Sequence, residues 1–91
     1  MFIVVTYDIS DDRCRTRVYK ALRRFGDPVQ YSVFECILDE SRLADMRTAV
    51  SDAVTGFHAT VRYYELCEPC RKGTITLGAA FTTSLKREYI V

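Results

Sequence analysis

Residues 2–8 read Phe-Ile-Val-Val-Thr-Tyr-Asp, and this short run decides how the rest of the chain can fold. β-Branched and aromatic side chains dominate residues 2–7, which is typical of a central strand buried on both faces. The apolar run stops at Asp8. We therefore predict a central strand whose carboxyl end presents Asp8, the position where α/β sheets usually carry functional groups.

The segment after this strand has the spacing of an amphipathic helix. Asp11 and Asp12 place negative charge in its first turn, and Ser10 is the expected N-cap. Gly26 is expected to stop the helix, and Asp27-Pro28 to form the following turn. The apolar positions at helical spacing are Cys14, Val18, Ala21, Leu22 and Phe25.

A second stripe along the same helix is basic. Six basic residues and no acidic residue lie between positions 13 and 24. The positions i, i+4, i+7 and i+11 are Arg13, Arg17, Lys20 and Arg24. A local basic stripe beside a carboxylate favours phosphate binding, so these four are the candidate nucleic-acid-binding residues. A solvated helix face is the plain alternative.

Further along the chain, residues 29–38 read as strand, and a slip of the apolar alternation between Val33 and Phe34 predicts a bulge or sharp bend. A second helix is expected from residue 39 to Gly56, and another strand at about 59–66. The stretch between the two helices is short, so we expect the second and third strands to share one continuous bent run. The apolar positions of the second helix are Leu43, Met46, Val50, Ala53 and Val54.

This order predicts an α/β fold, a ferredoxin-like βαββαβ sandwich. Residues 74–77 form a possible fifth strand, which would pair with the sheet edge of a second copy in a homodimer. The expected organisation is a ferredoxin-like domain over residues 1–78, followed by a C-terminal tail or partner-binding arm over residues 79–91.

The composition is that of a folded domain. Of the 91 residues, 48% are apolar and 27% are charged, which excludes a disordered chain. A core this small favours association, so a homodimer is expected. The chain opens without a basic leader and has no apolar run of membrane-spanning length, so we expect a cytoplasmic protein with no membrane partner. The four cysteines are expected to be thiols.

Asp8 is the candidate metal ligand. Mg²⁺ typically takes one or two protein carboxylates together with waters and phosphate oxygens. A twofold axis close to Asp8 would supply the second carboxylate from a partner chain. The plain alternative is that Asp8 caps the first helix or pairs with an arginine.

Other side chains suggest contacts with nucleic acid. Arg15 and Arg17 can neutralise phosphate oxygens. Tyr7, Tyr31 and Phe34 can stack on bases where they are exposed, although Tyr7 is expected to face inward.

Three further motifs predict no chemistry of their own. Ser32 has no histidine or lysine placed to activate it, and His58 is expected on the surface. The Cys67-Glu68-Pro69-Cys70 pair would need Cys14 or Cys36 to complete a zinc site. Redox pairs of this spacing precede a helix, whereas this one follows a strand, so packing cysteines in a turn are favoured.

Several of these motifs together carry a resemblance to a known family. They are Tyr7-Asp8-Ile9 at the end of the first strand, Asp12 and Arg17 in the first helix, Gln30-Tyr31-Ser32-Val33-Phe34-Glu35-Cys36 between the helices, Tyr64-Glu65-Leu66-Cys67 with Cys70, and Leu77-Gly78. With them, residues 2–78 resemble the CRISPR-associated protein two family, the small dimeric subunit of the spacer-acquisition machinery.

The resemblance implies a homodimer in which Asp8 of both chains faces a shared cleft and holds one Mg²⁺. It also implies metal-dependent endonuclease activity on RNA or DNA, and a role as the bridge between CRISPR-associated integrase dimers during spacer acquisition. On the matching positions, Asp8 would bind the metal, and Tyr7, Arg15, Arg17 and Phe34 would support the cleft as catalytic residues.

The chain departs from the family pattern at one point. Some relatives carry an arginine just before the glutamine of the second motif, where this chain has Asp27-Pro28-Val29. The role of that arginine is then absent or passes to Arg23 or Arg24, which puts efficient cleavage in doubt.

Two alternatives follow. One is a non-catalytic scaffold whose basic helices hold duplex DNA by its backbone, while the tail recruits the integrase. The other is an RNA-cleaving toxin such as virulence-associated protein D, which shares the fold. The C-terminal segment and the cysteine pair argue against the toxin.

Overall fold

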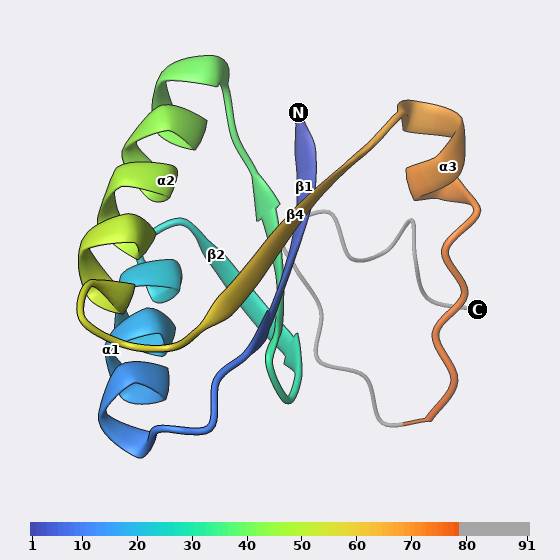
Figure 1. Ribbon diagram of the computed structural model, residues 1–91. Helices are drawn as coiled ribbons and strands as arrows, with labels where there is room; N and C mark the ends of the chain where they lie inside the picture. Colours follow the sequence, from blue (N-terminus) through green and yellow to red (C-terminus); the bar gives the residue numbers. More distant parts are fainter. Residues whose placement is uncertain (79–91) are drawn as a thin grey trace.

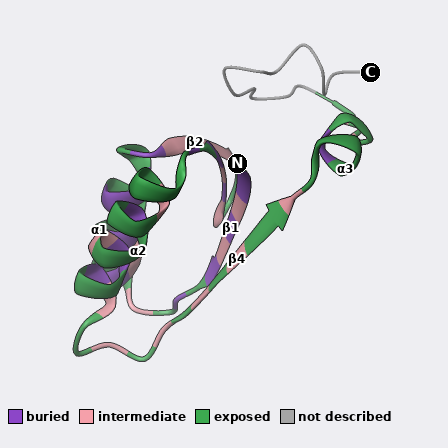
Figure 2. Cartoon of the chain, turned by 90° about the horizontal axis from the view of Figure 1, so that it is seen from above, coloured by how far each residue is buried: buried purple, intermediate pink, exposed green. Residues whose placement is uncertain are grey.

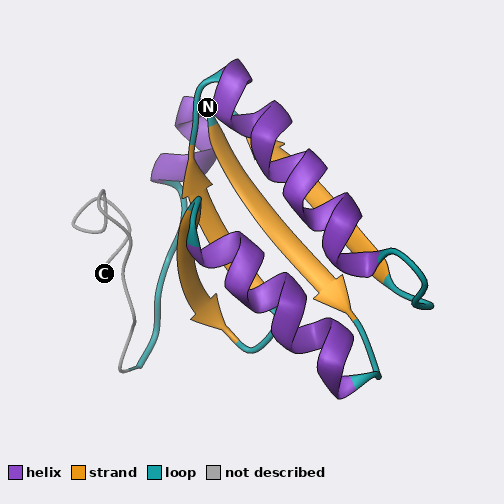
Figure 3. Cartoon of the chain, turned by 90° about the vertical axis from the view of Figure 1, so that its left-hand side faces the viewer, coloured by secondary structure: helices purple, strands orange, loops and turns teal. Residues whose placement is uncertain are grey.

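The computed structural model describes residues 1–78, in which the two long helices and the sheet form two layers (Figure 1). In chain order the elements are β1 (Phe2–Asp8), α1 (Asp12–Arg23), β2 (Gly26–Gln30), β3 (Val33–Ile37), α2 (Glu40–Val54), β4 (Thr60–Leu66) and α3 (Glu68–Lys72). The strands form one antiparallel sheet in the order β2-β3-β1-β4. Helices α1 and α2 lie side by side over one face of it (Figure 3). The predicted βαββαβ sandwich and the central position of β1 are confirmed.

The core lies between the two long helices and the sheet (Figure 2). Alternate side chains of β1 enter it, and so do the apolar faces predicted for both helices. The buried positions include Ile3, Val5 and Tyr7 of β1, Cys14, Val18, Ala21 and Leu22 of α1, Phe25 just after α1, and Met46, Val50 and Ala53 of α2.

Neither α1 nor α2 covers the opposite face of the sheet, and α3 lies on that side, beyond the end of β4 (Figure 1). Because successive strand residues point to opposite faces, Val4, Thr6 and Asp8 lie on this open face. Val4 and Thr6 are only half-buried within the described chain, so the expected burial of β1 on both faces is incomplete. The register places Thr6 opposite Arg62 and Asp8 opposite Thr60 of β4. Asp8 is exposed.

The start of α1 differs from the prediction by one residue. Asp11, not Ser10, is the N-cap, and its carboxylate accepts hydrogen bonds from the backbone N–H groups of Arg13 at 2.9 Å and Cys14 at 3.1 Å. The bond from Cys14 is the main reason why the pKa of Asp11 lies below its usual value. An aspartate carboxylate satisfies the free amides of a first helical turn as well as a serine hydroxyl does.

The prediction that Gly26 stops α1 is wrong. The helix ends at Arg23 with Arg24 as its C-cap, and Gly26 is the first residue of β2. A Cβ atom at Gly26 would lie 2.4 Å from the carbonyl oxygen of Glu35 and 2.5 Å from Sγ of Cys36. Glycine is needed here because β2 and β3 approach closely.

The region between the helices is a tight hairpin, so the predicted single bent run is wrong. A two-residue turn, Tyr31-Ser32, joins β2 to β3, and the predicted turn residues Asp27 and Pro28 lie within β2. The register irregularity falls between Pro28 and Gln30, not between Val33 and Phe34. The slip in apolar alternation arises because the chain reverses at the turn.

The segment after β4 also departs from the prediction. Residues 74–77 form no strand within the described chain, and only Thr76 makes a β-bridge. Ile75 and Leu77 are exposed. Pairing of this segment with a second copy stays a prediction, and the predicted tail or arm over residues 79–91 lies outside the described residues. Within residues 1–78 no helix has the length and apolar character that a membrane span requires.

Candidate functional site

Asp8 lies in a shallow depression on the open face of the sheet. The depression has a volume of about 330 Å³ and is lined by Thr6, Tyr7, Asp8, Thr60, Arg62 and Tyr64. We call it the Asp8 depression. Nη1 of Arg62 lies 3.5 Å from the hydroxyl of Tyr64, and both side chains are exposed. The depression thus combines one carboxylate, one guanidinium and several hydroxyl groups.

Arg62 is a site residue that the sequence analysis missed. Arg62 and Tyr64 interrupt the apolar pattern of β4, and this interruption was the available signal. In the structure, Val61 and Tyr63 pack against the core while Arg62 and Tyr64 point to the open face. The polar residues are therefore the second face of a regular strand.

The described side chains of the depression provide only part of the ligand set that a Mg²⁺ ion needs. Residues 1–78 contain no group of three histidine, cysteine, aspartate or glutamate side chains placed to hold a metal ion. One exposed carboxylate suffices only where waters and phosphate oxygens fill the other positions, because Mg²⁺ keeps much of its hydration. The residues present therefore fit an ion that substrate and a second carboxylate help to hold.

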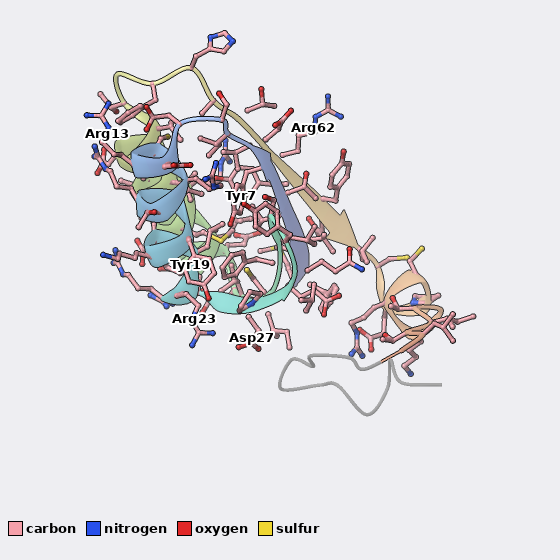
Figure 4. All side chains as sticks on the ribbon, turned by 90° about the horizontal axis from the view of Figure 1, so that it is seen from below. Tyr7, Arg13, Tyr19, Arg23, Asp27 and Arg62 are labelled. Carbon is pink, nitrogen blue, oxygen red and sulfur yellow. The ribbon has the colours of Figure 1, made fainter. Side chains whose placement is uncertain are left out.

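A second pocket opens on the other side of β1, between α1 and the β2–β3 turn. We call it the tyrosine pocket; it has a volume of about 230 Å³ and is lined by Tyr7, Arg15, Thr16, Tyr19, Gln30, Tyr31 and Ser32. Tyr7 faces inward, as predicted, and burial raises its pKa, with further contributions from Tyr19 and Tyr31. Figure 4 shows Tyr7 and Tyr19 in the space between β1 and α1.

Phe34 cannot stack on a base, because its side chain is 0% exposed. Its ring lies 6.4 Å from that of Tyr7 and meets the ring of Tyr19 edge-on at 5.4 Å. Phe34 therefore supports the tyrosine pocket from below by packing and touches no ligand.

The basic stripe lies in the helix layer, apart from Asp8. Arg13, Arg17, Lys20 and Arg24 are all exposed. The guanidinium groups of Arg13 and Arg17 lie 5.5 and 5.7 Å from the ring centroid of Phe57, and Nη2 of Arg17 donates to the carbonyl of Asp52 at 3.2 Å. Arg13 and Arg62 extend to opposite sides of the molecule (Figure 4).

The structure brings Arg15 to the tyrosine pocket and not to Asp8. Its Nη1 donates to the carbonyl of Ile9 at 3.0 Å, and its Nη2 is paired with Asp12. The predicted group is therefore divided. Asp8 lies in its depression, Arg15 and Phe34 lie at the tyrosine pocket, Arg17 lies in the basic stripe, and Tyr7 lines both the depression and the pocket.

The departure from the family pattern, Asp27-Pro28-Val29, lies in β2. Asp27 is directly opposite Glu35 of β3. Arg23 and Arg24 line neither the Asp8 depression nor the tyrosine pocket. Arg24 instead lies 5.3 Å above the ring of Phe25.

Replacing Glu35 with glutamine is expected to stabilise the protein at neutral pH. Burial raises the pKa of Glu35, and the nearby Asp27 carboxylate raises it further. Because the folded-state pKa lies above the unfolded-state value, the ionised carboxylate destabilises the fold. That destabilisation disappears as pH falls through the folded-state pKa to below the unfolded one.

Urea denaturation of Glu35→Gln and the unchanged protein between about pH 7 and pH 4 tests this expectation. The difference in unfolding free energy should shrink as the pH falls. Glu65→Gln, at an exposed position of β4, is the matched control. An equal gain in both variants would contradict the explanation.

The C-x-x-C pair is neither buried nor in a turn, so this part of the prediction is wrong. Cys67 is the N-cap of α3, and both Cys67 and Cys70 are exposed. A hydrogen bond between them lowers the pKa of Cys67 and raises that of Cys70. Cys14 and Cys36 lie in the core, where burial raises the pKa of Cys36 to about 12. The four thiols do not come together as a zinc site within residues 1–78.

The chain is similar to known proteins over almost its whole length. The family model for CRISPR associated protein Cas2 matches residues 1–74. A CRISPR-associated endoribonuclease Cas2 of Chloroflexus aurantiacus is 37% identical over 91 residues, which cover 100% of this chain and 98% of the relative. Another, from Methanospirillum hungatei, is 34% identical over 76 residues and 84% of each chain.

Solved structures agree with these matches. The crystal structure of Streptococcus pyogenes Cas2 superposes with a TM-score of 0.74 at 26% identity, covering 86% of this chain and 100% of that one. A hypothetical protein from Thermus thermophilus gives a TM-score of 0.75 at 32% identity, covering 91% and 96%. The resemblance in the sequence motifs is thereby confirmed: the chain belongs to the Cas2 family of CRISPR-associated proteins.

Proposed function

We propose that this protein is a homodimeric, Mg²⁺-dependent endonuclease of a CRISPR system, acting on RNA or DNA and bridging integrase subunits during spacer acquisition. The observation that carries the proposal is the exposed Asp8 carboxylate, which lines one depression together with Arg62 on the open face of the sheet. The names of the relatives, CRISPR-associated endoribonuclease and endonuclease, support the reaction class.

In this proposal each side chain of the Asp8 depression has its own role. Arg62 would bind a phosphate oxygen, since a guanidinium matches phosphate geometry. The hydroxyls of Thr60 and Tyr64 would donate hydrogen bonds to the same group and orient it. Asp8 would hold Mg²⁺, which when bound stabilises negative charge on the phosphate. The partner's copy of this carboxylate would complete the site, so activity depends on the dimer.

Cleavage of RNA and of duplex DNA with and without Mg²⁺, by the unchanged protein and by Asp8→Ala, tests the proposal. Cleavage that needs both the ion and Asp8 is the expected result. Cleavage that persists at full rate in Asp8→Ala would refute the metal-site assignment.

A specific observation favours a second candidate, the non-catalytic scaffold. The basic stripe lies on α1 in the helix layer, whereas Asp8 lies on the opposite face of the sheet, with Thr60 and Arg62 of β4. Nucleic acid held along the stripe by its phosphates would not need to reach Asp8. Binding by the stripe and cleavage at Asp8 are therefore separable properties.

The double variant Arg17→Glu, Arg24→Glu is expected to weaken duplex DNA binding and to flatten its salt dependence. The slope of log K against log salt is negative, and each lost phosphate contact reduces its magnitude by about 0.9, so two lost contacts should reduce it by about 2. Fluorescence anisotropy at several salt concentrations measures this slope. Arg47→Glu, Lys72→Glu changes the net charge equally at exposed positions outside the stripe. Equal slopes for the two double variants would remove the stripe from the binding surface.

A further inference from the structure

We infer that the tyrosine pocket is a binding site for one unpaired nucleobase of a nucleic-acid strand, with Arg15 holding an adjacent phosphate. The inference rests on the proposed function only in taking nucleic acid as the ligand. The pocket opens on the helix side of β1, whereas Asp8 lies on the open face. The inference therefore assigns a recognition site on the helix side of β1, which adjoins the Asp8 depression and shares Tyr7 with it.

The size of the pocket suits a single ring system. Its volume of about 230 Å³ is below the ~300–1,000 Å³ that is typical of pockets for drug-sized ligands. A base can enter such a pocket only after it leaves the stack of a duplex, or from a single strand. The walls, which include three tyrosine rings, provide faces on which a planar base can stack.

The tyrosines differ in exposure in a way that suits stacking. Tyr31 is 83% exposed at the β2–β3 turn, so most of its ring has no protein neighbour. Tyr19 is 43% exposed, and its ring packs against that of Phe34 in a T-shaped contact. Tyr7 is 8% exposed and closes the inner end. A free aromatic face over an ordered aromatic wall is the arrangement by which proteins stack unpaired bases.

Arg15 provides the positive charge at the same pocket. Its guanidinium has five N–H donors. Within the described residues it makes three hydrogen bonds, to the carbonyls of Ile9 and Ser10 and to the carboxylate of Asp12. Those bonds orient the group in advance, and donors remain for a phosphate oxygen. The pKa of Arg15 is raised chiefly by the bond to Asp12, with smaller contributions from Tyr31 and Tyr7. A base in the pocket would therefore bring its own phosphate toward a fixed cation.

The backbone of the turn holds Tyr31 in place. Ser32 has a φ of 64°, in the left-handed region that non-glycine residues rarely adopt. Its carbonyl accepts a hydrogen bond from the backbone N–H of Tyr7 at 3.1 Å, which ties the turn to β1. Strain of this kind persists where the surrounding structure enforces it, and it is concentrated at ligand-binding sites. The turn thus keeps Tyr31 at the pocket mouth.

The test uses single strands that carry one 2-aminopurine, as DNA and as RNA, in the presence of a chelator that prevents Mg²⁺-dependent cleavage. Stacking of this base on a tyrosine quenches its fluorescence, while the anisotropy of a dye at the strand end reports total binding. Tyr31→Ala is expected to bind about tenfold more weakly and to lose the quenching, since stacking on one aromatic ring contributes on this order. Tyr31→Phe should retain both. Ser41→Ala, exposed in the first turn of α2, is the control.

The possible results separate this inference from the proposed function. Suppose that quenching depends on Tyr31 but that the protein cleaves neither RNA nor DNA in the separate assay with Mg²⁺. That pair of results would support the pocket and refute the nuclease. Strand binding with quenching unchanged in Tyr31→Ala would overturn the pocket and leave the nuclease intact. Quenching lost in Tyr64→Ala instead would place the base in the Asp8 depression and also overturn the inference. Weaker quenching with the corresponding duplex is expected, because its bases are paired.

Discussion

Asp8→Ala is expected to lower Mg²⁺-dependent cleavage of RNA or DNA at least about 100-fold. Asp8 is the one carboxylate among the residues that line its depression, within the described chain. Its loss leaves Arg62 and the hydroxyl groups to bind phosphate but removes the charged ligand for the ion. Substrate affinity should therefore change much less than the cleavage rate, and rates measured over a range of substrate concentrations at fixed Mg²⁺ give both.

The matched control is Asp45→Ala, which removes an exposed carboxylate from α2. It should cleave at the rate of the unchanged protein, and both variants should melt at similar temperatures. A second measurement tests whether the two Asp8 carboxylates of a dimer act together. Added Asp8→Ala protein should then lower the activity of each unchanged chain as mixed dimers form. Additive activity in such mixtures would contradict a shared site.

Phe34→Ala is expected to lower the free energy of unfolding by about 3–5 kcal/mol. The side chain is fully buried at the centre of the core, and its removal leaves a cavity beneath Tyr7 and Tyr19. A loss of this size is a large part of the ~5–15 kcal/mol that stabilises a typical domain. Urea denaturation followed by far-ultraviolet circular dichroism gives the value.

Tyr31→Ala is the matched aromatic truncation, three residues away in the same hairpin. Because Tyr31 is largely exposed, its loss should change stability by no more than about 0.5 kcal/mol. Phe34→Leu keeps most of the apolar volume and should cost less than Phe34→Ala. Equal destabilisation by Tyr31→Ala and Phe34→Ala would show that Phe34 has no special place in the core.

Much of the fold could be predicted from local patterns. The apolar run of residues 2–7 and the helical spacing of Cys14, Val18 and Leu22 predicted elements that the structure contains. The hairpin was missed because a two-residue turn without glycine gives only a weak signal. Ser32 adopts the left-handed conformation, and a glycine at this position would have indicated the turn in the sequence. The close approach at Gly26 involves β3, so the sequence around Gly26 gives no sign of it.

The sequence by itself determined that Asp8 ends the central strand and that a basic stripe follows on the first helix. Both depend on the alternation and period of neighbouring residues, which any strand or helix must obey. The tertiary structure alone decided which face Asp8 occupies, because β1 is apolar on both faces and only the packing of α1 and α2 distinguishes them. It also brought together Tyr7 of β1, Tyr19 of α1 and Tyr31 of the β2–β3 turn, through contacts between segments that are distant in the sequence.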